Sequence, residues 1–192
     1  MNDAELVKQV INGNSNAFRY LVARYQRLVV HIVGRIVQQQ QDIEDICQEV
    51  FIKVYRKMKH FRGDARLSTW IAKIAYNTSI TYVKRQRGKE LSFDEHPVLV
   101  STKEDSSFNL RALEREEAKK YLLQAIEKLP VQYRSLLTLF HLEEFSYREI
   151  EKITEMPEGT IKSYLSRARK MLKEQLKTWS EKEKTNIFTD YA

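Results

Sequence analysis

Apolar residues recur along this chain in steps of three and one, and no segment alternates convincingly between apolar and polar positions. The clearest stripe runs from Phe18 to Val37 without interruption. Side chains spaced in this way lie on one face of an α-helix, whereas a half-buried strand requires strict alternation. The pattern therefore predicts an all-α fold, with a helix over this stretch and Asn14 or Ser15 as its N-cap.

Two further helices are expected before residue 90. One begins at Asp42, a capping residue, and has an inner stripe that includes Ile43, Val50, Tyr55 and the single cysteine, Cys47. Because Cys47 lies on this stripe, we interpret it as a small core residue rather than a reactive thiol. The next helix, over about residues 68–87, is expected to bury Ile71, Ile74, Ala75, Thr78 and Tyr82.

The helical pattern then stops and resumes. Residues 88–109 contain Pro97, several Ser and acidic residues and no sustained period, as in a flexible linker. A helix is expected from Leu110 to Leu129, and Pro130 suits the first position of another over 131–142. The order predicts two small helical domains joined by a flexible linker.

The C-terminal domain has the clearest local signal. Residues 146–149, SYRE, form a capping box that opens a helix through Ile153, and residues 156–159, MPEG, predict a turn. A last helix over about 158–177 is expected to bury Ile161, Leu165, Ala168, Leu172 and Leu176. Two helices joined by a tight turn are a helix-turn-helix.

Composition limits the possible functions. The formal net charge of +7 favours a polyanionic partner, although a merely basic surface would give the same value. The five glycines are too far apart for a nucleotide-binding loop, and the four histidines show no metal-ligand spacing with one another or with Cys47. We therefore expect no enzyme, no catalytic residues, no metal and no cofactor.

Location follows from similar observations. The N-terminus is acidic and polar where a secretory signal would be basic and then apolar. The longest apolar run, 28–37, contains His31 and Arg35 and is too short to span a bilayer. With one cysteine no internal disulfide can form. These features predict a cytoplasmic protein without membrane insertion.

Two helices have polar faces of opposite sign. The outer face of the last helix combines small hydrogen-bonding groups with Arg and Lys, which suits base edges and phosphates of duplex DNA. A solvated cationic face is the alternative. The helix after Asp42 is acidic in its first turns, through Glu44, Asp45 and Glu49, and suits a positively charged protein partner. Favourable interaction with the helix dipole would explain Glu44 and Asp45 without a partner.

The stretch FRGDARLSTWIAKIAYN, residues 61–77, combines aromatic and basic groups, as surfaces that hold unpaired bases do. Phe61 and Trp70 can stack on a base, and Asn77 can recognise a base edge. Asn77 follows Trp70 by two helical turns, so both share a face with Ile74. A role of Phe61 and Trp70 in the core alone is the alternative.

In this order the three features resemble an extracytoplasmic-function (ECF, group 4, sigma-70 family) sigma factor of bacterial RNA polymerase. The matching stretches are DIEDICQEVFIKVYRKMKHF, FRGDARLSTWIAKIAYNTSITYVKRQRG and LPVQYRSLLTLFHLEEFSYREIEKITEMPEGTIKSYLSRARKMLKEQL. The resemblance implies a region 2 domain over 1–90, a linker over 91–110, a region 4 domain over 111–178 and a tail over 179–192. No further domain is expected on either side.

The resemblance also implies roles for residues. Core RNA polymerase would bind Asp42, Asp45, Gln48 and Glu49. The −10 element, as a single strand with one base extruded, would bind Phe61, Arg62, Arg66, Trp70, Lys73, Ile74, Asn77, Lys84, Arg85 and Arg87. The duplex −35 element would bind Thr160, Lys162, Ser163, Ser166, Arg167 and Lys170.

The resemblance further implies that an anti-sigma factor silences the chain, and that the linker acids Asp94, Glu95, Glu104 and Asp105 lie near the RNA path of the polymerase. Tyr164 and Ser166 depart from residues common in the family, so the −35 sequence cannot be carried over. We hypothesise a sigma factor that directs promoter recognition, −10 melting and transcription initiation. The alternative is a stand-alone helix-turn-helix regulator that binds operator DNA as a dimer, which leaves the acidic helix and residues 61–77 without a role.

Overall fold

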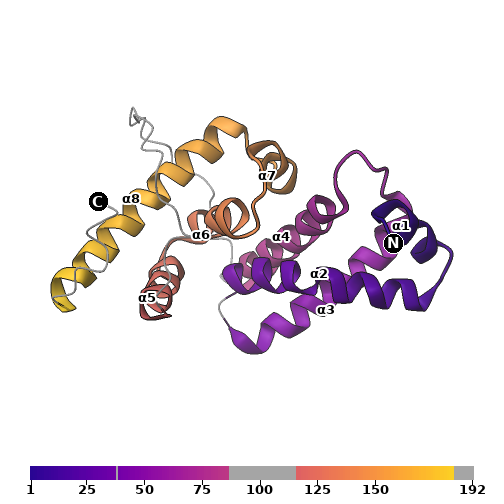
Figure 1. The fold of residues 1–192 in the computed structure, drawn as a ribbon, viewed down its shortest axis with the longest axis horizontal. Helices are drawn as coiled ribbons and strands as arrows, with labels where there is room; N and C mark the ends of the chain where they lie inside the picture. Colours follow the sequence, from indigo (N-terminus) through magenta and orange to yellow (C-terminus); the bar gives the residue numbers. More distant parts are fainter. Residues whose placement is uncertain (38, 87–115, 184–192) are drawn as a thin grey trace.

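The computed structural model describes residues 1–37, 39–86 and 116–183, all helices and short connections (Figure 1). The elements are α1 (Asp3–Ile11), α2 (Ser15–Ile36), α3 (Gln40–Lys57), the 3-10 turn η1 (Met58–His60), α4 (Leu67–Gln86), α5 (Glu116–Glu127), α6 (Val131–Leu137), the π-helical turn η4 (Thr138–Leu142), α7 (Tyr147–Thr154) and α8 (Glu158–Glu183). The described ranges contain no strand, which confirms the all-α prediction. None of their helices combines the length and apolar character needed to cross a bilayer.

The first predicted helix is confirmed as α2. The side chain of Asn14 accepts hydrogen bonds from the backbone N–H groups of Asn16 and Ala17, so Asn14 is the N-cap. Leu21, Val29 and Val33 on its stripe are completely buried. The chain before it, for which no helix was predicted, forms α1, which adds Leu6, Val7 and Val10 to the core.

The start of α3 differs from the prediction. The helix begins at Gln40, and Asp42 is not its N-cap. Asp42 lies in the first turn instead, where its carboxylate accepts a hydrogen bond from the hydroxyl of Tyr82 in α4. A partner from a distant helix has therefore replaced the local capping bond.

Cys47 and Tyr55 were both placed on the inner stripe of α3. Cys47 is partly buried, and burial raises the pKa of its thiol to about 11, as expected of an inert core residue. Tyr55 is half exposed, and its ring packs edge-on against Phe18 with centroids 4.9 Å apart. Its placement in the core was wrong: Val54 and Met58 remain buried, so Tyr55 lies at the edge of the buried face rather than inside it.

The helix-turn-helix is confirmed. Ser146 and Glu149 form the reciprocal capping box of α7, and α8 begins at Glu158. Glu155 ends α7 in the left-handed conformation, with φ of 62°. Along α8 the stripe Ile161, Leu165, Ala168 and Leu172 is completely buried.

Two boundaries in the C-terminal half are refined. Pro130 is the N-cap of α6 rather than its first helical residue. The last helix continues to Glu183, beyond the predicted end at 177. The predicted linker, the first residues of the helix expected from 110 and the end of the tail lie outside the described residues.

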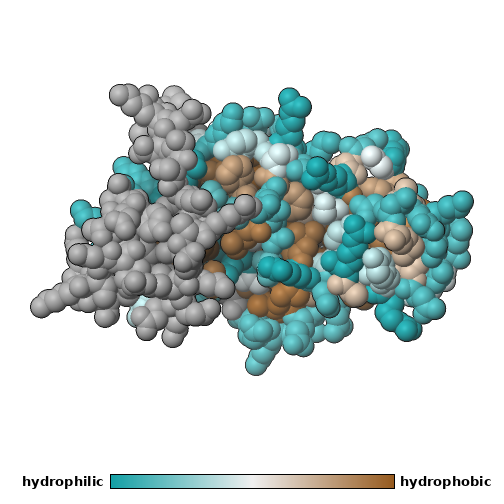
Figure 2. Space-filling view, in the orientation of Figure 1, coloured by the Kyte–Doolittle hydropathy of each residue, from teal (hydrophilic) through white to brown (hydrophobic). Residues whose placement is uncertain are grey.

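The two groups of helices share an interface. In Figure 1, α4 lies between α2 and α3 on one side and α6 and α7 on the other, and α2 also contacts α6. The buried apolar side chains of both groups belong to one continuous cluster. Figure 2 shows apolar surface gathered over the middle of the molecule, whereas hydrophilic side chains predominate at the α1 end. The position of α4 therefore determines which of its side chains remain accessible.

We predict that Ile71→Ala lowers the free energy of unfolding by about 2 to 5 kcal/mol, because Ile71 is completely buried in α4 and its loss leaves a cavity. Ile52→Ala, the same truncation at a side chain that is 49% exposed, is the matched control and should cost less than about 0.5 kcal/mol. Urea denaturation of both variants measures the difference. Equal losses would contradict the packing described for α4.

Candidate polymerase and nucleic-acid interfaces

The acidic face of α3 is largely accessible. Asp45, Gln48 and Glu49 are exposed, and Glu49 forms an ion pair with Lys53 at 2.6 Å, one turn along the helix. Asp42, the fourth predicted polymerase-binding residue, is only partly exposed because of its bond to Tyr82. The structure thus groups three of the four residues on one solvent-facing surface.

Ile52 extends this surface and was missed from the sequence. It follows Gln48 by four positions and Glu49 by three, so it lies on the same face, and it is exposed. An exposed isoleucine beside acidic groups provides apolar contact area for a partner. Its spacing of four from Gln48 and three from Glu49 could have indicated that it lies on the same helix face.

The aromatic pair expected at the −10 surface is present. The rings of Phe61 and Trp70 lie with centroids 5.3 Å apart and a tilt of 59°. Both side chains are partly buried and pack against the core. Part of each ring is therefore in the core while the rest remains accessible to solvent. Gly63, with φ of 79°, provides the left-handed turn that leads the loop from Phe61 back to α4.

Further along α4 the predicted side chains differ in exposure. Asn77 is exposed and therefore accessible to a base, whereas Ile74 is buried and belongs mainly to the core. Arg62, Lys84 and Arg85 are exposed, as a track for a nucleic-acid backbone requires. Arg87 lies outside the described residues.

Two of the expected DNA-binding cations already contact acids of α7. Lys73 Nζ lies 2.9 Å from Glu155 Oε1, and Arg66 Nη1 lies 3.8 Å from Glu149 Oε1. The side chain of Arg66 is nevertheless 80% exposed. These pairs join the expected −10 surface to the first helix of the helix-turn-helix, an arrangement for which the sequence contained no local signal.

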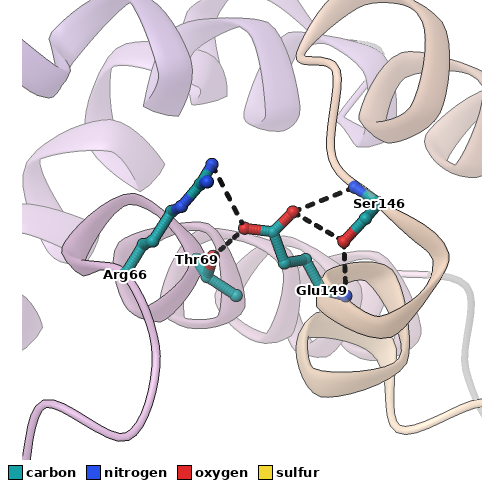
Figure 3. A network of polar contacts seen from close by, with 4 residues as sticks. All are labelled: Arg66, Thr69, Ser146 and Glu149. Atoms are coloured by element: carbon teal, nitrogen blue, oxygen red, sulfur yellow. Dashed lines mark hydrogen bonds and ion pairs between the residues drawn. The ribbon is translucent and has the colours of Figure 1, made fainter.

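Glu149 is the centre of this contact (Figure 3). Its Oε2 accepts from the backbone N–H of Ser146 at 2.9 Å and from the Ser146 hydroxyl at 2.8 Å, while its Oε1 accepts from the hydroxyl of Thr69 at 3.2 Å. Burial alone would raise the pKa of Glu149, but these hydrogen bonds and the charge of Arg66 outweigh it and lower the pKa. Glu149 is thus an ionised group shared by α7 and α4.

The expected −35 surface lies along the first turns of α8. Lys162 and Lys170 are exposed, and Thr160, Ser163, Ser166 and Arg167 are partly exposed. Lys162 forms an ion pair with Glu158 at 2.9 Å and lies 5.3 Å from the ring centroid of Tyr147. All six predicted residues therefore have accessible side chains on the second helix of the helix-turn-helix.

Tyr164 and Arg169 of α8 are only partly exposed. Tyr164 packs edge-on against Tyr133 with centroids 5.4 Å apart. His141 has its pKa lowered to about 4, mainly by burial and also by the charge of Arg169, which is only partly exposed. Within the described ranges no cluster of three or more His, Cys, Asp or Glu side chains could hold a metal ion.

Comparison with known proteins adds independent support. The family model of sigma-70 region 2 matches residues 21–89, and that of sigma-70 region 4 matches residues 119–172. The chain is 36% identical over 179 residues to the ECF RNA polymerase sigma-E factor of Escherichia coli (strain K12), covering 90% of this chain and 93% of that protein. A stand-alone helix-turn-helix regulator would not be expected to match region 2.

Solved structures agree in fold. CnrH, solved in complex with the cytosolic domain of CnrY, has a TM-score of 0.65 at 19% identity and covers 92% of this chain and 97% of its own. The sigma factor RpoE of Bartonella quintana, solved with the anti-sigma factor NepR, has a TM-score of 0.61 at 24% identity and covers 83% and 96%. Because the match to the sigma-E factor spans nearly all of both chains and includes both sigma-70 regions in order, the chain belongs to the ECF family of RNA polymerase sigma factors.

Proposed function

We propose that this protein binds core RNA polymerase and directs it to promoters, where it recognises the −35 element as duplex and the −10 element as a melted strand. The observation that carries this proposal is the order of three accessible surfaces: acidic on α3, aromatic and basic at the start of α4, and polar and basic on α8. Each has a different partner chemistry, and a promoter-specificity subunit needs all three.

The domain boundaries of this proposal are a region 2 domain over 1–90 and a region 4 domain over 111–178. They are supported by the two family matches, which fall inside these ranges. The intervening linker and its acids, expected near the RNA path, lie outside the described residues.

Polymerase docking is assigned to α3. Asp45, Gln48 and Glu49 offer carboxylates and an amide to a basic surface, and Ile52 adds apolar area beside them. Asp42 has a second role in our proposal, because its bond to Tyr82 fixes the start of α3 against α4. The docking surface would thereby be oriented relative to the DNA-binding helix.

Recognition of the −10 strand is assigned to the start of α4. Phe61 and Trp70 would stack on the extruded base and Asn77 would hydrogen-bond to its edge, while the exposed cations bind the backbone. Melting costs a few kcal/mol for a flipped base, and a surface that binds only the extruded base recovers that energy in the open state.

Recognition of the −35 duplex is assigned to α8. Its N-terminal turns present Thr160, Ser163 and Arg167 to base edges, and Lys162 and Lys170 to phosphates. The chain itself would make or break no bond, since nucleotide addition belongs to the polymerase. It would act in the cytoplasm, where an anti-sigma factor would cover these surfaces until a signal releases them.

We predict that Asn77→Ala reduces open-complex formation about three- to tenfold, because one hydrogen bond to the extruded base is lost. Binding to duplex −35 DNA should be unchanged. Asn16→Ala, the same substitution at an exposed site on α2, is the control. Permanganate footprinting measures the first property and a duplex-binding assay the second; an equal loss of both would identify Asn77 as structural.

We predict that Arg167→Ala weakens −35 binding by about 1 to 3 kcal/mol and relaxes preference at one base pair, if Arg167 contacts a base edge. Binding to a set of single-base variants of the promoter measures this, with Arg19→Ala on α2 as the control. A uniform loss across all sequences, with a salt slope smaller by about one, would instead assign Arg167 to a phosphate.

We predict that Asp45→Lys weakens binding to core polymerase at least about tenfold, because a like charge is then placed against a basic partner surface. Glu5→Lys makes the same change in net charge on α1 and should have little effect. Fluorescence anisotropy of the labelled full chain with core polymerase measures both affinities. Equal affinities would remove α3 from the docking surface.

A further inference from the structure

The α4–α7 interface brings together charged groups from the two domains. Besides the pairs Lys73–Glu155 and Arg66–Glu149, the Nζ of Lys152 in α7 donates to the backbone carbonyl of Asp64 at 3.0 Å. The loop before α4 and the first turns of α4 therefore contact α7 through two carboxylates and one ammonium group; Figure 3 shows the contacts of one of them, Glu149. Exposed pairs of this kind contribute little individually.

Buried polar contacts make the interface specific. Thr69, which donates to Glu149, is only 1% exposed. Tyr76 of α4 is buried beside the side chain of Ser135 of α6. A buried hydroxyl without a partner costs free energy, so these groups favour this one arrangement of the two domains.

A second contact closes the interface around the end of α2. The buried guanidinium of Arg134 in α6 donates to the carbonyl of Ile36 at 3.2 Å and to that of Glu127 at 2.9 Å. Nearby, His31 lies 2.6 Å from Glu143 and Arg35 lies 3.1 Å from Glu127. Contacts at both ends of the interface would thus hold the domains together.

The carboxylates of α7 bind cations in the same way as the phosphates of DNA would. The carboxylates of Glu149 and Glu155 pair with Arg66 and Lys73, the cations assigned above to the −10 strand. A carboxylate and a phosphate are both anionic acceptors, and one ammonium or guanidinium group satisfied by the first is less available to the second. Helix α7 itself lies beside the segment that the strand would have to approach.

We propose that α7 is an intramolecular competitor of the −10 strand, so that the chain alone adopts a closed state in which the region 4 domain masks part of the region 2 DNA surface. The contact between α4 and α7 is inferred from the geometry alone. The competition between α7 and the −10 strand also depends on the proposed function of the α4 surface. Because a ligand binds less tightly when only a fraction of the protein is competent, opening the contact raises the affinity for single-stranded DNA.

The closed state can be tested on the unmodified full chain. A carbodiimide joins an amine directly to a carboxylate in contact with it, so it should link Lys73 to Glu155, and mass spectrometry identifies the joined peptides. We expect this product in the free chain and a clear decrease when single-stranded −10 DNA is added. Absence of the product from the free chain would overturn the proposal, as would an undiminished yield with saturating DNA bound.

The competition is tested by charge reversal. Glu155→Lys replaces attraction to Lys73 with repulsion, and single-stranded −10 DNA should then bind about two- to fivefold more tightly. Glu151→Lys makes the same charge change at an exposed position of the same helix and is the matched control. Circular dichroism of both variants verifies that α7 and the remaining helices are intact. Equal affinities of the two variants would overturn the competition.

The outcomes separate this inference from the proposed function. If neither variant nor the unmodified chain binds single-stranded −10 DNA, the −10 assignment fails and the competition fails with it, while the linked peptide still reports the closed contact. If DNA binds but the linked peptide is absent, the proposed function stands and the closed state is overturned.

Discussion

The burial of α4 from more than one side is the constraint on which the rest of this structure depends. Its buried residues include Ile71, Ala75 and Tyr76 and are distributed around the helix rather than along one stripe. A helix of that kind is stable only between two layers, here α2 and α3 on one side and α6 and α7 on the other. The same helix bears Trp70, Asn77 and Lys73, so packing decides which of the side chains proposed to bind DNA remain accessible.

Burial on two sides also creates a need for polar partners. The hydroxyl of Ser79 is satisfied within α4 by the carbonyl of Ala75 at 2.9 Å, but that of Thr69 donates to Glu149 of α7. Glu149 in turn caps its own helix through Ser146. One carboxylate therefore joins the local geometry of the helix-turn-helix to the proposed −10 surface, and partial burial makes it dependent on all of its donors.

Predictions from the sequence succeeded where the determining interactions are local. The cap at Asn14, the capping box at residues 146–149 and the buried stripe of α8 depend on residues within about one turn of each other, and all are confirmed. The predicted start of α3 was wrong because the carboxylate of Asp42, instead of capping the helix, accepts a hydrogen bond from Tyr82, 40 positions away. The placement of Tyr55 was wrong because periodicity indicates a face of the helix but not how much of its edge the neighbouring helices cover.

By itself the sequence determined most of the helices, the caps at Asn14 and Ser146, the helix-turn-helix and, through stretches matching two sigma-70 regions, the family. Only the tertiary structure decided which charges and hydroxyls meet. Thr69 and Glu149 are 80 positions apart, and Lys73 and Glu155 are further still. Local periodicity is set by neighbours within a turn, whereas such pairs depend on how whole helices pack. The sequence could therefore predict the three surfaces but not that one of them contacts the other domain.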